Sequence, residues 1–228
     1  MENPAPTPAV AAPVFRECAE CGFLSSDPTF ADAATRCPLC GRTGDTRREF
    51  PPDRQRRLDG RIRAYFADDE SEIVVILGAA LLEALLEDIL DRIMAAHGAD
   101  VAVRGTLLDN VRSIGTRLGR LFPQLTGVEF EDAVEKFGHR DFPKRWRTLR
   151  SQRNAFIHDT PYRDFTEGLG KDAALETLTL LDQAYGLFAS LNNEFVADAL
   201  KGRKDEPDLT PTPHLAMADD DPPGSVAP

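Results

Sequence analysis

The sequence predicts a mainly α-helical protein, in which a helical bundle follows a small cysteine-rich module. Two observations carry this prediction. Apolar residues recur at helical spacing between residues 64 and 200, and no convincing strand pattern appears after residue 60. All four cysteines of the 228-residue chain lie before this region, between residues 18 and 40. The fold class is therefore a helical bundle with a separately stabilised module at its amino-terminal side.

Composition divides the chain into five segments. Residues 1–14 and 201–228 are rich in Pro, Ala and Asp without apolar periodicity, and we expect both to be disordered tails. Residues 15–48 form the cysteine module, and residues 64–200 form the helical domain. Between them, residues 49–63 are expected to be an arginine-rich connector that begins with the Pro51-Pro52 break.

The first helix of the domain is expected from Ser71 to His97, because nearly every position suits a helix and Gly98 ends the pattern. Acidic residues repeat along it at four-residue spacing and form one stripe on an otherwise apolar helix: Glu83, Glu87 and Asp91.

A second helix is expected near Gly105–Phe122, closed by Pro123. Its apolar seam alternates steps of four and three residues: Leu107, Val111, Ile114, Leu118 and Leu121. Such a seam packs against a partner helix, either within the domain or in a second copy of the chain. Three further helices are expected at Phe130–Phe137, Pro143–His158 and 171–200.

Charge and hydropathy exclude some classes of function. The net charge of −11 argues against non-specific coating of nucleic acid. Arginine and lysine still gather in residues 42–63 and 140–153, as either a local nucleic-acid contact or a solvated face. The longest uncharged apolar run, Ile73–Leu82, is about half of what a bilayer needs. With no signal-peptide pattern and no disulfide framework, we expect a cytoplasmic protein without membrane contact.

The cysteine spacing predicts a structural zinc site. Cys18 and Cys21 form one pair, Cys37 and Cys40 form a second, and fifteen residues separate the pairs. Two tight turns at this spacing present four thiolates tetrahedrally, and a glycine follows each pair where the backbone must bend. A closed all-thiolate site leaves no position for a substrate, so Zn²⁺ is expected to stabilise a small β-rich ribbon.

Two points about this module stay open at the sequence level. Rubredoxin-like iron is the minor alternative to zinc, for which the spacing is short. Three arginines beside the module allow contact with phosphate without requiring it: Arg42, Arg47 and Arg48.

Arg153, Asn154 and His158 are candidate catalytic residues at the end of the helix expected at Pro143–His158. A histidine can move a proton on and off a ribose 2′-hydroxyl, and a guanidinium can stabilise the phosphate charge of the transition state. Asn154 and His158 are four residues apart and share a helix face, so the amide can orient the imidazole.

Arg153 also stands where the apolar stripe of its helix, Trp146, Leu149 and Phe156, calls for an apolar residue. A guanidinium there needs an acid or a ligand phosphate as partner, and the acidic stripe of the first helix can supply the acid. A purely structural Arg–Glu pair beside a helix-terminal histidine would have the same sequence pattern.

Arg92 and His97 repeat the same spacing but have a plainer interpretation. His97 precedes Gly98 and suits a helix carboxyl terminus, and Arg92 is expected to pair with Asp88 one turn earlier.

The segment Leu149–His158, with the preceding acidic-striped helix and the final long helix, resembles the HEPN superfamily. The resemblance covers residues 64–200 and rests on the family's Arg-x4-His motif with Asn after the Arg. A subgroup of HEPN-like proteins of unknown function, found near restriction and phage-defence genes, also carries an amino-terminal zinc ribbon.

The resemblance implies a metal-independent endoribonuclease that works as a homodimer, with both motifs facing one cleft. Arg153 and His158 would be catalytic and Asn154 a supporting polar residue. RNA would be cleaved by attack of the 2′-oxygen on the adjacent phosphate, in toxin or phage-defence biology, with an antitoxin or defence-system protein as partner. Two other functions remain open: a non-catalytic adaptor built from the zinc ribbon and the helical domain, and a nucleic-acid-binding module led by the ribbon.

Overall fold

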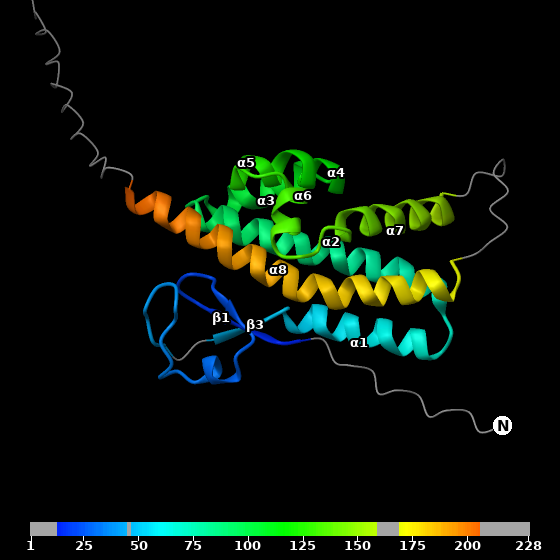
Figure 1. The fold of residues 1–228 in the computed structure, drawn as a ribbon, viewed down its shortest axis with the longest axis horizontal. Coiled ribbons are helices and arrows are strands. Elements are labelled where there is room, and N and C mark those ends of the chain that lie inside the picture. Colours follow the sequence, from blue (N-terminus) through cyan, green and yellow to red (C-terminus); the bar gives the residue numbers. More distant parts are fainter. Residues whose placement is uncertain (1–12, 45–46, 159–168, 206–228) are drawn as a thin grey trace, which may run out of the picture.

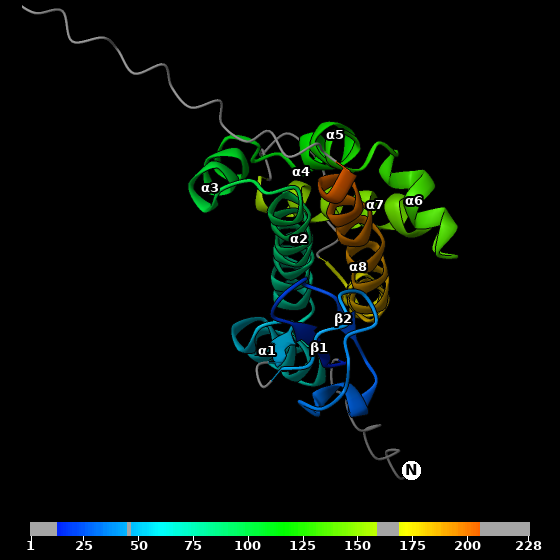
Figure 2. The same cartoon turned by 90° about the vertical axis from the view of Figure 1, so that its left-hand side faces the viewer.

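In a computed structural model, which describes residues 13–44, 47–158 and 169–205, the protein is mainly α-helical, as predicted, with one three-stranded sheet. The two longest helices, α2 (Ser71–Ala96) and α8 (Lys171–Asp205), pack lengthwise and form the centre of the bundle. Figures 1 and 2 show α1 (Asp53–Ala67) on one side of this pair and α7 (Phe142–Ile157) on the other.

The α2–α8 contact is close because Gly78 lies at the crossing point. A Cβ atom added to Gly78 would stand 2.2 Å from Cγ2 of Thr177, whose side chain is fully buried. Around this point both helices bury their apolar faces in one continuous core, which includes Leu85, Ile89, Leu181 and Phe188. The sequence predicted α2 correctly, and His97 follows it with Nε2 at 2.9 Å from the carbonyl oxygen of Leu125.

The predicted second helix is not continuous. Residues Val101–Asn110 form α3, the chain leaves the helix at 111–113, and α4 (Ile114–Thr116), a π-helical turn (Arg117–Leu121) and α5 (Phe122–Thr126) follow. Pro123 does not close the helix as predicted, because α5 continues directly from the π-helical turn and ends at Gly127, which has a φ of 73°. A short helix α6 (Phe130–Lys136) leads to α7.

The residues assigned to a connector form structure instead. Strand β3 (Arg47–Phe50) and helix α1 cover most of residues 49–63 and continue to Ala67. Asp59 and Arg63 lie on the buried side of α1, and Arg63 bridges Asp59 (2.8 Å) to Asp182 of α8 (2.6 Å). Because arginines are frequent in this segment, its apolar face, which includes the fully buried Ile62, was not recognised from the sequence.

The acidic stripe of α2 joins three separate elements to this helix. Its acids pair with arginines of α7, of the π-helical turn and of α3: Glu83 with Arg150 and Arg153, Glu87 with Arg117, and Asp91 with Arg104. Each pair lies at the edge of the core, where partial desolvation strengthens the attraction.

The cysteine module packs directly on the helices. Strands β1 (Phe15–Cys18), β2 (Leu24–Ser25) and β3 form an antiparallel sheet in the order β2-β1-β3. The Asn193 side chain of α8 accepts from the Leu24 backbone N–H and donates to the Leu24 carbonyl, both at 2.7 Å. Phe50 is fully buried in the same core as the helices. The module is thus part of the fold rather than a tethered appendage.

Candidate functional site

The four cysteines converge on one point of the module. Their Sγ atoms all lie within 4.8 Å of one another, with 3.7 Å between Cys18 and Cys40 and 3.6 Å between Cys21 and Cys37. A metal–sulfur bond of about 2.3 Å in tetrahedral geometry places the sulfur atoms about 3.8 Å apart. The separations are too long for disulfides, whose sulfur atoms are about 2.05 Å apart. The cluster therefore has the geometry to hold one metal ion.

The two turns that present these thiols share one backbone design. In the first, the N–H of Gly22 donates to the Cys18 carbonyl (2.9 Å) and the N–H of Cys18 donates to the Phe23 carbonyl (2.8 Å). The second repeats this pattern with Gly41, Cys37 and Arg42 at 2.8 and 2.9 Å. Both glycines have a left-handed φ, 73° and 72°, as the sequence predicted from their positions.

The environment acts differently on the individual thiols. Burial raises the pKa of Cys18, but the backbone N–H groups of Cys21 and Glu20 outweigh it and lower that pKa to about 7. Burial raises the pKa of both Cys21 and Cys37. Without a cation the cluster therefore holds fewer than four thiolates at neutral pH, and a metal ion would complete the ionisation.

The arginines beside the module make intramolecular contacts. The guanidinium of Arg47 lies 4.2 Å from the centre of the Phe30 ring, and its Nη2 donates to the Thr35 carbonyl at 2.9 Å. Arg42 is exposed and lies 3.7 Å from Glu20. Of the three arginines proposed for phosphate contact, Arg47 is therefore engaged within the module.

Arg153 lies between α7 and α2, partly buried, with 17% of its side chain exposed. Its Nη2 donates to Glu83 at 3.3 Å and to Oδ1 of Asn154 at 3.0 Å, and its Nε donates to the same Asn154 oxygen at 3.2 Å. The acid that the sequence required for this arginine is thus Glu83 of the predicted acidic stripe. The amide of Asn154 fixes the guanidinium, where the sequence had suggested that it orients His158.

His158 follows α7 directly, and its backbone N–H donates to the Asn154 carbonyl at 3.0 Å. Its side chain is exposed, as are Phe156 (38% exposed) and Ile157 (50% exposed). Phe156 had been expected on the buried stripe of its helix. The stripe ends at Leu149, because Trp146 and Leu149 face the core while the last turn of α7 extends past it.

Arg92, which with His97 repeats the spacing of Arg153 and His158, has a structural role. The Nη1 atom of Arg92 lies 2.6 Å from Glu17 of β1, and its Nη2 atom lies 3.7 Å from Asp88, the partner expected from the sequence. Its guanidinium also lies 5.1 Å from the centre of the Phe50 ring. Arg92 thus joins the cysteine module to α2.

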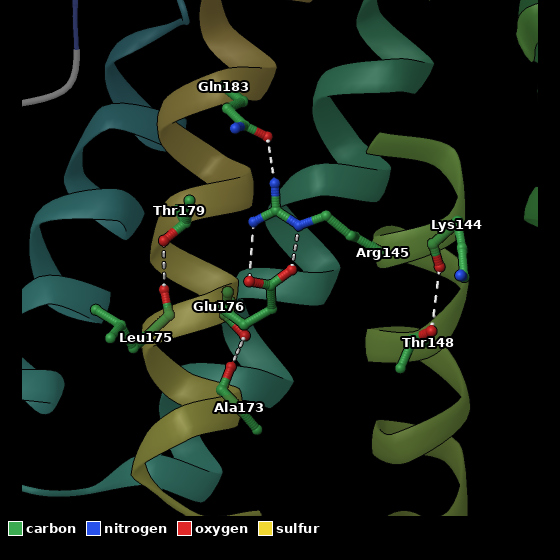
Figure 3. Close-up of polar contacts among 9 residues, drawn as sticks. Lys144, Arg145, Thr148, Ala173, Leu175, Glu176, Thr179 and Gln183 are labelled. Carbon is green, nitrogen blue, oxygen red and sulfur yellow. Dashed lines mark hydrogen bonds and ion pairs between the residues drawn. The ribbon is translucent and has the colours of Figure 1, made fainter. Parts of the chain in front are cut away.

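A groove of about 480 Å³ runs between α7 and α8, on another face of α7 from the Arg153–Glu83 contact. Arg145 spans one side of it and binds Glu176 through two hydrogen bonds of 2.5 and 2.8 Å and Gln183 through one of 3.0 Å (Figure 3). Hydrogen bonding to Glu176 raises the pKa of Arg145. The sequence showed the basic stretch that contains Arg145 but not the acid on α8 that neutralises it.

At the carboxyl-terminal end of α7, Arg153 can bind an anion and the exposed imidazole of His158 can exchange a proton.

In the part of the chain that the structure describes, every helix is too short or too polar to cross a bilayer. Comparison with protein-family models, curated proteins and solved structures finds no match to this chain.

Proposed function

We propose that this protein is a metal-independent endoribonuclease of the HEPN type that acts as a homodimer in toxin or phage-defence biology. The observation that carries the proposal is the arrangement at the end of α7, where Asn154 and Glu83 hold the Arg153 guanidinium while His158 is exposed one helical turn beyond. RNA cleavage without a metal ion needs at least a positioned cation to stabilise the phosphate charge and an accessible imidazole to transfer protons.

In the proposed reaction, neutral His158 removes the proton from a ribose 2′-hydroxyl, and the 2′-oxygen attacks the adjacent phosphorus. The bond from phosphorus to the 5′-oxygen breaks, and a protonated His158 of the second subunit gives its proton to that oxygen. Arg153 stabilises the extra negative charge on the phosphate oxygens. The products are a 2′,3′-cyclic phosphate and a 5′-hydroxyl end.

The dimer in this proposal would form at the carboxyl-terminal end of α7, beside His158. Phe156 and Ile157 are large apolar residues exposed directly before His158. Burying them against a second copy would remove apolar area from water and bring two His158 side chains toward one cleft.

The first test is cleavage of end-labelled RNA by the purified protein in EDTA, with His158→Ala compared with the wild type. We expect His158→Ala to lower the cleavage rate at least about 100-fold, the usual contribution of a general acid–base. His139→Ala, which removes an imidazole beside α7, serves as the matched control and should cleave like the wild type.

Metal content, circular dichroism and oligomeric state are measured on all three proteins, so that loss of the fold is not mistaken for loss of catalysis. Equal cleavage by His158→Ala and wild type, or products without cyclic-phosphate ends, would contradict the proposed mechanism.

A second function is favoured by one specific contact. Because Glu83 pairs with Arg153 within the fold, the pair can serve structure alone, and the chain would then be a non-catalytic adaptor that binds a defence-system protein. That function predicts no RNA turnover by the wild type at any concentration, together with a stable complex with a co-expressed partner.

We also propose that the ion held by the cysteine cluster is Zn²⁺. Four thiolates in a tetrahedral arrangement favour this ion, and they leave no open coordination position for a substrate. Its role would be to hold the module together.

A further inference from the structure

The contact at Glu83 differs from the other two ion pairs of the α2 acidic stripe. Glu87 and Asp91 each accept from one arginine, at 2.8 and 2.7 Å. Glu83 accepts from two through a single oxygen, because Nε of Arg150 and Nη2 of Arg153 both lie 3.3 Å from Oε1. Two guanidinium charges face one carboxylate charge there, so this group alone in the stripe carries a surplus positive charge.

The guanidinium groups that carry this surplus charge also have unused hydrogen-bond donors. A guanidinium carries five N–H donors, and Arg150 uses only Nε, so its two terminal nitrogens have no protein acceptor among the described residues. Arg150 and Arg153 have 22% and 17% of their side chains exposed, so both cations are only partly solvated. Partial desolvation of an incompletely neutralised cation is unfavourable, and a bound anion would offset it.

We propose that Arg150, together with Arg153, forms a phosphate-binding site for the backbone of RNA, with Arg150 contacting a phosphate that flanks the one being cleaved. The choice of RNA as the source of the phosphate rests on the proposed ribonuclease function. Arg150 precedes His158 by eight residues, about 12 Å along a helix. Arg153 lies one helical turn nearer to His158, so Arg153 is assigned to the scissile phosphate and Arg150 to the neighbouring one.

The geometry suits phosphate because both terminal nitrogens of Arg150 and Nη1 of Arg153 have no protein acceptor among the described residues and can donate to non-bridging oxygens. The other arginines of this stretch differ, since Arg145 donates two hydrogen bonds to the Glu176 carboxylate, which neutralises its charge. The side chain of Arg147 is 64% exposed and lies 3.6 Å from Glu131. Arg147 therefore carries the same charge as Arg150 on the same helix but does not contact Glu83, which makes it a suitable control.

The test measures binding of a single-stranded 2′-O-methyl RNA oligonucleotide, which keeps the phosphates and lacks the attacking hydroxyl, so the wild type cannot cleave it. Binding is measured over a range of salt concentrations for the wild type, Arg150→Ala, Arg150→Lys and the control Arg147→Ala. Circular dichroism and thermal unfolding confirm the fold of each; Arg150→Ala leaves Glu83 paired with Arg153.

We expect Arg150→Ala to weaken binding on the order of tenfold and to lower the salt slope by about 0.7, the value for one phosphate contact with a single strand. Arg150→Lys should keep most of the slope and lose part of the affinity, and Arg147→Ala should have a smaller effect on both. Equal losses for Arg150→Ala and Arg147→Ala would overturn the proposal.

Parallel cleavage of unmodified RNA separates this inference from the proposed function. Cleavage that depends on His158, with no specific effect of Arg150→Ala on binding, would keep the ribonuclease and remove the phosphate site. Binding that depends on Arg150 without cleavage would keep the phosphate site and remove the ribonuclease. No binding by the wild type would overturn the site.

Discussion

Arg117 shows how a single charged residue can fix the path of the chain. Its residue is only 8% exposed, yet its three nitrogen atoms are all engaged: Nε donates to the Val111 carbonyl, Nη2 to the Leu108 carbonyl and Nη1 to Glu87. The two carbonyls belong to the end of α3, where the helix leaves its last acceptors without intrahelical donors. The guanidinium thus ends α3 and joins it to α2.

Replacing Arg117 should therefore be costly. We expect Arg117→Met to lower the free energy of unfolding by about 3 kcal/mol, because Glu87 and two carbonyl oxygens lose their partner together. Urea denaturation measures the change. Arg120→Met, at an exposed site on the same π-helical turn, is the matched control and should change stability by less than about 0.5 kcal/mol. Equal midpoints for the two variants would refute the role given to Arg117.

At the scale of elements, the sequence predicted helices whose signals are local and missed those that depend on distant partners. The limits of α2 follow from its apolar run and Gly98. Helix α1 was missed because arginines dominate its composition, and one of them is compensated by Asp182, more than a hundred residues away. The break after Asn110 was missed because the apolar seam continues through it, while the side chain that ends the helix, Arg117, lies beyond the break.

The candidate site was predictable to a similar degree. The cysteine cluster and the need of Arg153 for an acid follow from spacing and from the apolar stripe. The assignment of Asn154 to Arg153 instead of His158, and the sharing of Glu83 by two arginines, depend on side-chain directions in three dimensions. Sequence periodicity specifies a helix face but not which of two neighbours a side chain will reach.

The α2–α8 crossing gives a prediction at the element scale. We expect Gly78→Ala to destabilise the protein by about 2 kcal/mol, although alanine favours a helix, because the new methyl group would overlap Thr177. Gly186→Ala, within α8 and with no atom in reach of the added methyl group, should instead stabilise by up to about 1 kcal/mol. Thermal unfolding of both variants measures the difference, and two shifts of the same sign would contradict the close-packing argument.

At the scale of the whole molecule, the cysteine module and the helical bundle share one core. Asn193 pairs with the backbone of Leu24, Asn192 donates to the Gly22 carbonyl at 2.9 Å, and Glu17 pairs with Arg92. Loss of order in the module would therefore expose apolar area on α2 and α8 as well.

Disrupting the proposed metal site should accordingly destabilise the helices too. We expect Cys37→Ser to lose the bound ion and to lower the thermal midpoint measured by helical circular dichroism, since metal binding and folding are coupled. Metal content is measured by atomic emission, and Ser26→Ala in the same module is the control that should retain both metal and midpoint. An unchanged helical midpoint in a metal-free Cys37→Ser protein would show that the bundle folds independently of the module.

The four thiols are unequally accessible, since Cys18, Cys21 and Cys37 are buried and Cys40 is exposed. A chelator or an oxidant can approach a sulfur atom only from solvent, so exchange of an ion held by the cluster would begin at Cys40. The other three ligands would still hold the ion after this first step, which makes dissociation gradual and rebinding fast. The residence time of such an ion would then be governed by one side chain at the surface, whereas its affinity would depend on all four.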